Sequence, residues 1–198
     1  PQDLTRALVL GATLGQGWLW GRPGHQIRAS SFRPERFAAR PIGPSISATP
    51  YEVVRHARRV RRAPKHLLLP ISKSLELAAL QSRVPPLLLA SFEHARFFSP
   101  STARRYAELA ARLPFVGALG VDMPPVPAPG VRGTALSVQD PLASEWTLVV
   151  LGSHKSTALM ARDLGEDGPD GDRAFEFVVT YDRDLVTAAA HSLVARLT

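Results

Sequence analysis

The sequence predicts an α/β or α+β fold, in which a sheet of roughly five strands has helices packed on it. Two observations favour this class. Beyond residue 65, apolar runs of strand length alternate with segments whose apolar residues recur at helical spacing. Hydrophobic residues make up 45% of the chain, which is enough to build a core. An N-terminal helix–strand extension is expected to precede this domain.

The elements are expected in the following order along the chain. Short apolar runs predict strands at residues 87–92, 115–119, 131–138, 146–151 and 174–181. Helical periodicity predicts helices at residues 51–65, 72–82, 101–112, 154–164 and 182–197. Ser72, Ser101 and Ser153 are the expected N-caps of three of these helices. The acidic segment 165–172 is interpreted as a solvated, hairpin-like connection.

The positive charge is concentrated near the N-terminus. The chain carries a formal net charge of +7, and residues 1–65 hold 12 Lys and Arg against 3 Asp and Glu. Within the predicted helix 51–65, Arg55, Arg58 and Arg62 recur at helical spacing, which indicates a basic amphipathic helix. Such a face can bind nucleic acid or anionic lipid. No nucleic-acid reading motif accompanies it, so docking on an acidic neighbour is the favoured interpretation, and nucleic acid is not expected as a partner.

Several functional classes receive no support from the composition. The chain contains no cysteine, which excludes disulfides and thiolate metal sites and suits a cytoplasmic location. No apolar run approaches the roughly 18 residues needed to span a bilayer, so no membrane partner is expected. The six histidines show no paired spacing typical of a metal site. No cofactor can be named from these patterns.

Residues 14–23 read Leu-Gly-Gln-Gly-Trp-Leu-Trp-Gly-Arg-Pro. This string resembles the closing strand of an EAL-type cyclic di-GMP phosphodiesterase barrel. The resemblance implies that residues 1–23 are the C-terminal remnant of such a barrel, followed by a proline-rich linker at 24–50. Metal-assisted phosphodiester hydrolysis needs a cluster of oxygen ligands, whereas residues 1–23 contain one acid, Asp3. No catalysis is therefore expected from this chain.

A second resemblance covers about residues 68–197. The strings Asp-Pro-Leu-Ala-Ser-Glu-Trp at 140–146 and Arg-Ala-Phe-Glu-Phe-Val-Val-Thr-Tyr-Asp at 173–182 resemble the DICT sensory domain. The resemblance implies that residues 51–198 form a non-catalytic module that senses a small ligand or a light-linked signal. The module would then modulate an attached or partner EAL phosphodiesterase. The alternative is a protein-interaction module without a ligand, and a homodimer is expected in either case.

The candidate ligand-binding residues are polar or aromatic and lie mostly near strand ends. They are Glu93, His94, Arg96, Phe98, Trp146, Arg173, Tyr181 and Asp182.

Each of the main candidates also has a structural interpretation. Arg173 shares a strand face with Phe175 and should therefore seek an anion, either a carboxylate such as Asp182 or Asp140 or an acidic ligand. Trp146 could belong to the core or face a pocket. Glu93 and His94 could form a pH-sensitive pair or a polar loop, and Phe98 could line a pocket or anchor that loop. Asp140 is expected to cap a turn.

Overall fold

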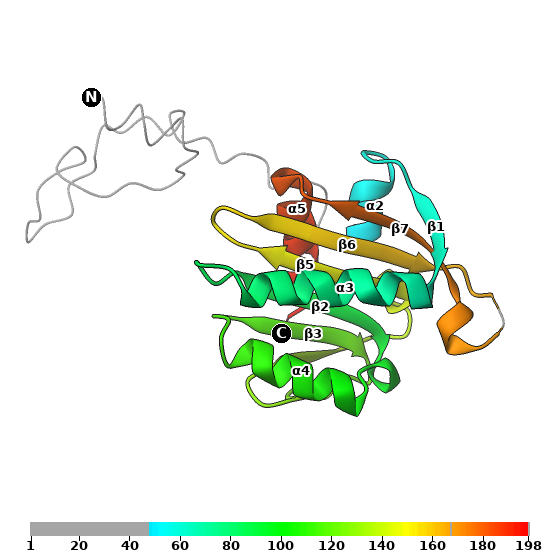
Figure 1. The fold of residues 1–198 in the computed structure, drawn as a ribbon. Coiled ribbons are helices and arrows are strands. Elements are labelled where there is room, and N and C mark those ends of the chain that lie inside the picture. Colours follow the sequence, from blue (N-terminus) through cyan, green and yellow to red (C-terminus); the bar gives the residue numbers. More distant parts are fainter. Residues whose placement is uncertain (1–47, 167, 198) are drawn as a thin grey trace, which may run out of the picture. The chain divides into compact units, whose positions relative to one another are not determined.

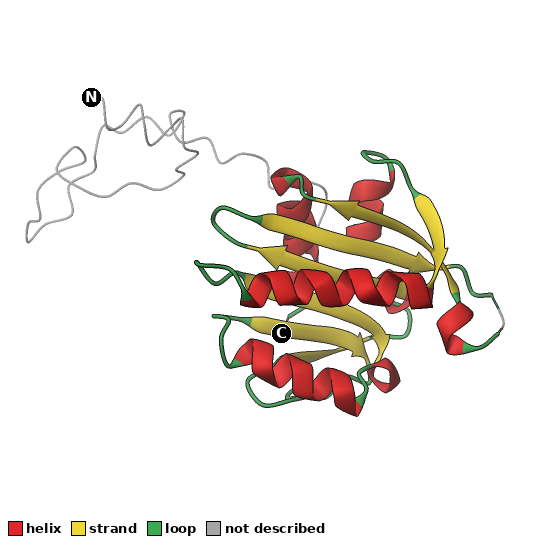
Figure 2. Cartoon of the chain, viewed as in Figure 1, coloured by secondary structure: helices red, strands yellow, loops and turns green. Residues whose placement is uncertain are grey.

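Seven strands form one mixed sheet within residues 48–166 and 168–197, which are the residues that the computed structural model describes (Figure 2). The strands are β1 (Arg61–Pro64), β2 (Leu87–His94), β3 (Val116–Val121), β4 (Arg132–Leu136), β5 (Glu145–Leu151), β6 (Ser156–Asp163) and β7 (Ala174–Thr180). Their order across the sheet is β1-β7-β6-β5-β2-β3-β4. The strands β2, β3 and β4 are parallel, whereas β5, β6, β7 and β1 extend the sheet from β2 in an antiparallel manner.

Helices cover both faces of this sheet. The α-helices of the described residues are α2 (Pro50–Arg55), α3 (Lys65–Leu80), α4 (Pro100–Ala110) and α5 (Arg183–Val194). The 3₁₀ turns are η2 (Ala95–Phe97), η3 (Pro141–Ser144) and η4 (Asp170–Asp172). In Figure 1, α3 and α4 lie in front of the sheet and α2 and α5 behind it. We call these the front and back faces.

Alternation along the strands divides the core between these faces. On β2, Leu88 and Phe92 belong to the front cluster with α3 and α4, whereas Leu89 belongs to the back cluster with α2 and α5. On β5, Trp146 and Val149 are divided in the same way. The central strands are buried on both faces, and an α/β class with helices on the sheet is therefore confirmed.

The five predicted strands are all present, with bounds that differ by no more than two residues. The sheet is larger than expected because β1 and β6 were not predicted. The predicted helix at 154–164 is wrong, since residues 156–163 form β6, paired with β5 on one side and β7 on the other. Ala, Leu and Met favour helices locally, but two neighbouring strands supply backbone partners that outweigh this preference. Ser153 therefore lies in a turn, where Gly152 donates its N–H to the carbonyl of Lys155 at 2.9 Å.

The basic helix predicted at 51–65 is also wrong beyond its first turns. The helix α2 ends at Arg55, and Arg61–Pro64 forms the edge strand β1 against β7. The N–H groups of Ala57 and Arg58 both bond to the carbonyl of Val54, which closes the helix. Charged side chains and a proline are features that edge strands commonly carry. The arginines of this segment therefore do not form one helical face.

The other helices agree with the sequence in kind and differ at their starts. The helix predicted at 72–82 begins at Lys65 and tolerates Pro70 inside it, although proline removes one backbone bond. The helix α4 is capped by Ser99 rather than Ser101, and the Ser99 hydroxyl accepts the N–H of Thr102 at 3.2 Å. The acidic connection 165–172 contains η4. The predicted barrel remnant at 1–23 and the linker through residue 47 lie outside the described residues.

Candidate ligand-binding site

A pocket of about 60 Å³ opens between α3 and the front face of the sheet. It lies where β2 ends and β5 begins. Its lining combines aliphatic and aromatic side chains with charged ones: Lys65, Leu69, Ser72, Lys73, Glu76, Phe92, Glu93, Phe97, Thr102, Arg105 and Trp146. We call this the α3 pocket. Apolar walls with a few convergent polar groups are typical of small-molecule sites.

The helix α3 supplies the largest share of the lining because of its periodicity. Lys65, Leu69, Lys73 and Glu76 follow one another at steps of three or four residues and therefore share one side of the helix. Ser72 and Glu76 are buried, although polar side chains are rarely placed on the inner face of a helix. The helix thus presents polar groups to the sheet at the place where the pocket lies.

The end of β2 carries an unusual backbone conformation. Glu93 has a φ of 59°, which is in the left-handed region, and the pairing of β2 with β3 shifts register between Ser91 and His94. This irregularity accompanies a Glu93 carboxylate that is only 5% exposed and bonds to Arg173. The Oε1–Nη2 distance is 2.5 Å and the Oε2–Nη1 distance is 3.5 Å.

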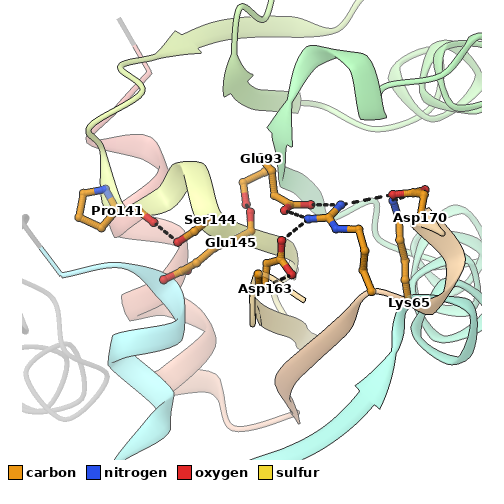
Figure 3. A network of polar contacts seen from close by, with 10 residues as sticks. Lys65, Glu93, Pro141, Ser144, Glu145, Asp163 and Asp170 are labelled. Atoms are coloured by element: carbon orange, nitrogen blue, oxygen red, sulfur yellow. Dashed lines mark hydrogen bonds and ion pairs between the residues drawn. The ribbon is translucent and has the colours of Figure 1, made fainter. Parts of the chain in front are cut away.

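Arg173 is the centre of a network of charges. Figure 3 shows Glu93, Asp163 and Asp170 arranged around its guanidinium group, which donates hydrogen bonds to all three. Lys65 donates to both carboxylate oxygens of Asp170 at 2.7 Å, and its backbone N–H bonds to the carbonyl of Arg173 at 2.9 Å. The network therefore joins the end of β2, the end of β6, the start of β7 and the start of α3.

The pKa values in this network follow from burial and pairing. Burial raises the pKa of Glu93, although the hydrogen bond from Arg173 opposes the shift. Burial would lower the pKa of Arg173, but its bonds to Asp163 and Glu93 outweigh burial and raise it. For Asp170, burial is likewise outweighed by Lys65, which lowers the pKa. Arg173 therefore stays charged and holds the carboxylates together.

Phe97 forms a wall of the pocket beneath several cations. The Nζ of Lys65 lies 4.4 Å from its ring centroid, and the Cζ atoms of Arg173 and Arg96 lie at 4.7 Å and 4.9 Å. A cation over an aromatic face is attracted by the ring quadrupole. Phe97 sits in η2, directly after β2, so these contacts hold that turn against the charge network.

The far side of the pocket is formed by a second ion pair, in which the carboxylate is buried and the arginine is partly exposed. Glu76 of α3 is 2% exposed, and its Oε2 accepts a hydrogen bond from Nε of Arg105 on α4 at 2.5 Å. Burial and the neighbouring Glu76 raise the pKa of Tyr106 well above its ordinary value. The pair therefore joins the two front helices across the pocket.

The structure places the predicted site residues in three groups. Glu93 and Trp146 line the α3 pocket, and Arg173 contacts Glu93 directly. Arg96 lies over Phe97, and the His94 ring contacts the Phe97 ring with centroids 6.3 Å apart.

The third group lies outside the pocket. Phe98 packs edge-on against Phe92 and Tyr106, so it anchors the loop in the core. Tyr181 is 70% exposed, and Asp182 caps α5 and pairs with Arg58. Both follow the opposite end of β7 from Arg173, so they do not share its site.

The expected carboxylate partners of Arg173 were wrong. Asp182 pairs with Arg58, and Asp140 accepts a hydrogen bond from Arg196 at 2.9 Å. Asp140 also accepts the N–H of Leu142, as predicted for a turn cap, and these bonds outweigh burial and lower its pKa. Trp146 belongs to the core and also lines the pocket, since it is 8% exposed and packs edge-on against Phe175.

Sequence reasoning missed the contribution of α3. A helix expected to begin at Ser72 excludes Lys65 and Leu69, and it treats Ser72 as a cap. A signal was nevertheless present, because Ser72 and Glu76 lie one turn apart among apolar residues of the buried face. Arg105 carried no such signal, because its partner Glu76 is distant in sequence.

On the back face, the buried carboxyl of Glu145 contacts the helix α2. Glu145 at the start of β5 accepts the N–H of Tyr51 in α2 at 3.0 Å, and burial raises its pKa to about 7. The hydroxyl of Tyr51 donates to Glu176 of β7 at 2.7 Å. Burial, together with Glu176, raises the pKa of Tyr51 to about 12. Hydrogen bonds of Tyr51 thus connect α2 to β5 and β7.

A wider groove of about 740 Å³ lies at the other end of α3, beside the turn between β5 and β6. It includes Arg83, Ser153, His154 and Lys155, whose side chains are exposed. Arg183 holds the turn by donating to the carbonyls of Gly152 and Ser153. The groove therefore lacks the buried polar groups that distinguish the α3 pocket.

Two features are absent from the part of the chain that the structure describes. No group of three or more His, Asp or Glu side chains in residues 48–166 and 168–197 could hold a metal ion. Among the helices that the structure describes, none has the length and apolar composition needed to cross a bilayer.

The fold and the pocket define a sheet domain with helices on both faces and a small, partly open site between α3 and the sheet. Residues 51–164 match the family model described as the sensory domain in diguanylate cyclases and two-component systems. The chain therefore belongs to the DICT family of sensory domains. Among curated proteins, none matches the chain.

Two solved structures show limited likeness to this chain. One is TrmBL2, an archaeal chromatin protein, with a TM-score of 0.42 and 12% identity over 71% of this chain. The other is the polyphosphate kinase from Porphyromonas gingivalis, with a TM-score of 0.39 and 13% identity over 65% of this chain. The matches span 52% and 22% of those proteins. Values this low carry no argument about function.

Proposed function

We propose that this domain binds a small ligand in the α3 pocket and thereby modulates an attached or partner EAL-type cyclic di-GMP phosphodiesterase. One observation carries the proposal. The pocket is walled by Phe92, Phe97 and Trp146, and it is flanked by two ion pairs with buried carboxylates, Glu76–Arg105 and Glu93–Arg173. Burying a carboxylate is costly unless it is paired and hydrogen-bonded, and binding sites commonly contain such groups.

The network offers a route from the pocket to the N-terminal side of the domain. Lys65 lines the pocket, follows β1 without a gap, and bonds through its backbone to Arg173. A ligand that moved Lys65 or Phe97 would therefore shift β1 against β7. The N-terminal segment 51–83, through which we propose that the signal passes, contains α2, β1 and α3. A ligand acts as a signal only when its affinity differs between two such arrangements.

The identity of the regulated enzyme rests on the resemblance of residues 14–23 to an EAL barrel strand. The DICT family is described as a sensory domain of diguanylate cyclases and two-component systems, which fits regulation of cyclic dinucleotide signalling. A cytoplasmic location is part of the proposal, and the lack of cysteine supports it.

The test compares two substitutions on the same helix. Ser72→Leu places a larger side chain in the α3 pocket, and Ser74→Leu places it on the exposed side of α3. Native mass spectrometry and visible absorption of the 198-residue protein should detect a bound mass or chromophore in the wild type and in Ser74→Leu but not in Ser72→Leu. In a protein that also carries the complete phosphodiesterase, only Ser72→Leu should remove the response of cyclic di-GMP hydrolysis to that molecule.

Equal occupancy in the two variants would place any ligand elsewhere and overturn the proposed site. Loss of the bound mass in both variants would indicate damage to α3, which circular dichroism would detect. A wild type that carries no bound mass and gives no response would exclude the sensory proposal and favour the second candidate.

The second candidate is a dimerisation module without a ligand. The outer face of α3 exposes Leu67 by 55% and Leu77 by 54%, with Pro70 between them. Such a face on two copies could pair about a two-fold axis. Leu77→Glu should then convert a dimer to a monomer in sedimentation velocity, whereas a wild type that is already monomeric would exclude this candidate.

A further inference from the structure

We infer that the ligand of the α3 pocket is a short-chain carboxylate, with its hydrocarbon chain inside the pocket and its carboxylate at Lys73. This inference rests on the proposed function and adds the chemical class of the ligand. Three features of the pocket support it: its volume, the distribution of apolar side chains, and the one cation of its lining that is not engaged.

The volume sets the size of the buried part. The α3 pocket, at about 60 Å³, has less than half the volume of a cavity of about 150 Å³ that accommodates benzene. It holds a chain of about two or three carbons, whereas a flat chromophore or a nucleotide needs several times that space. The hydrophobic surroundings of Leu69, Phe92 and Trp146 suit an alkyl chain.

The charges set the sign of the polar end. The pocket lining contains three cationic side chains, Lys65, Lys73 and Arg105, against two anionic ones, Glu76 and Glu93. Their ion-pair partners Arg173, Asp163 and Asp170 bring the totals to four cations and four carboxylates, so the pairing of individual groups decides the sign of the ligand.

The ion pairs decide which cation is available. Arg105 is engaged by Glu76 at 2.5 Å, Lys65 by Asp170 at 2.7 Å, and Glu93 by Arg173 at 2.5 Å. Among residues 48–166 and 168–197, Lys73 has no ion-pair partner.

Ser72, the residue before Lys73 in the chain, also lines the pocket. Within the described part of the chain, the Ser72 hydroxyl likewise has no hydrogen-bond partner. An ammonium and a hydroxyl on adjacent residues can both donate to one carboxylate.

The experiment uses three probes of equal chain length with the full 198-residue protein: sodium butyrate, 1-butanol and n-butylammonium chloride. Ligand-observed NMR titration at pH 7 measures the dissociation constant of each. We expect butyrate to bind about three- to fivefold more tightly than 1-butanol, because a partly exposed ion pair contributes up to about 1 kcal/mol and about 1.4 kcal/mol corresponds to tenfold. Butylammonium should bind more weakly than either, and octanoate should bind no better than butyrate because its chain exceeds the pocket.

The matched variants locate the recognition. Lys73→Met should remove the difference between butyrate and 1-butanol while retaining the affinity for 1-butanol. Lys155→Met, a lysine of the distant groove, should change neither. Ser72→Leu should abolish binding of all three probes.

Each outcome bears on the inference. A preference for butyrate that persists in Lys73→Met, or butylammonium binding as tightly as butyrate, would overturn the assigned class. If none of the probes binds but the protein carries another bound mass that Ser72→Leu removes, the ligand class is wrong and the sensory site remains. If no probe binds and no mass is carried, both the inference and the proposed function fail.

Discussion

The two faces of the sheet are filled with different kinds of side chain. Under α3 and α4, the buried cluster contains the aromatic residues Phe92, Tyr106, Trp146 and Phe175. Under α2 and α5, the buried cluster consists of Val, Leu, Ala and Met. Aliphatic side chains of varied shape fill space closely, whereas rigid rings beside long charged chains can leave a gap. The α3 pocket lies on the aromatic face.

The two faces also differ in the partners of their buried carboxyl groups. On the front, Glu76 and Glu93 are each paired with an arginine. On the back, Glu145 accepts the backbone N–H of Tyr51, and its pKa is raised to about 7. The comparison indicates that the front face is built to hold charges in a fixed arrangement around a space. The back face joins the start of the domain to the sheet.

The largest effect is expected from removing the central cation of the front face. Arg173→Ala leaves Glu93 and Asp163 without their shared partner and should lower the free energy of unfolding by about 4 kcal/mol at pH 7. Urea denaturation measures this loss. Arg183→Ala, an arginine that bonds mainly to carbonyls of an exposed turn, is the control. A loss below about 1 kcal/mol for Arg173→Ala would show that the network adds little to stability.

The next prediction is that a substitution in the core of the back face lowers stability without changing ligand affinity on the front face. Leu193→Ala removes a fully buried side chain of α5 and should cost roughly 3 kcal/mol in urea denaturation. It should leave the affinity of the α3 pocket for butyrate unchanged. Leu77→Ala, at an exposed position, should cost less than about 0.5 kcal/mol. A change in butyrate affinity in Leu193→Ala would show that the two faces are coupled.

The third effect is a pH dependence on the back face. Because burial raises the pKa of Glu145 from 4.5 to about 7, the folded state keeps a proton that the unfolded chain releases earlier. The contribution of Glu145 to the free energy of unfolding is therefore fully present below about pH 4.5. It is lost as the pH rises to about 7, and it stays constant at higher pH.

Glu145→Gln should remove this dependence. The free energy of unfolding of the variant, relative to that of the wild type, should increase by roughly 2 kcal/mol from pH 5 to pH 8. The reason is that each pKa unit corresponds to about 1.4 kcal/mol. Urea denaturation at the two pH values tests this prediction. A constant difference between variant and wild type would mean that Glu145 titrates normally.

The smallest effect concerns the cap of α4 on the front face. Ser99→Ala should cost about 1 kcal/mol in thermal or urea denaturation, because the Ser99 hydroxyl accepts the N–H of Thr102. Ser101→Ala should cost close to nothing, although the sequence favours Ser101 as the cap. A larger loss for Ser101→Ala would reverse the assignment.

The sequence predicted those strands that can be recognised from their own residues, without knowing which strands they pair with. The apolar run at 87–92 and the alternation at 174–180 identify β2 and β7 by themselves. The strand β6 was missed because its composition is compatible with a helix, and only pairing with β5 and β7 decides its state. Part of the candidate site was predicted in the same way: Arg173 could be recognised as needing an anion, but its carboxylate partners could not be named.

The amino-acid sequence by itself determined the class of fold, the resemblance to a sensory family and the need of Arg173 for an anion, because these depend on composition and local periodicity. Only the tertiary structure decided that Glu93 and Asp163 meet Arg173 and that α3 encloses the pocket. These contacts join residues up to 80 positions apart. Nothing in the local pattern specifies such a distance, because it is set by how the strands are ordered in the sheet.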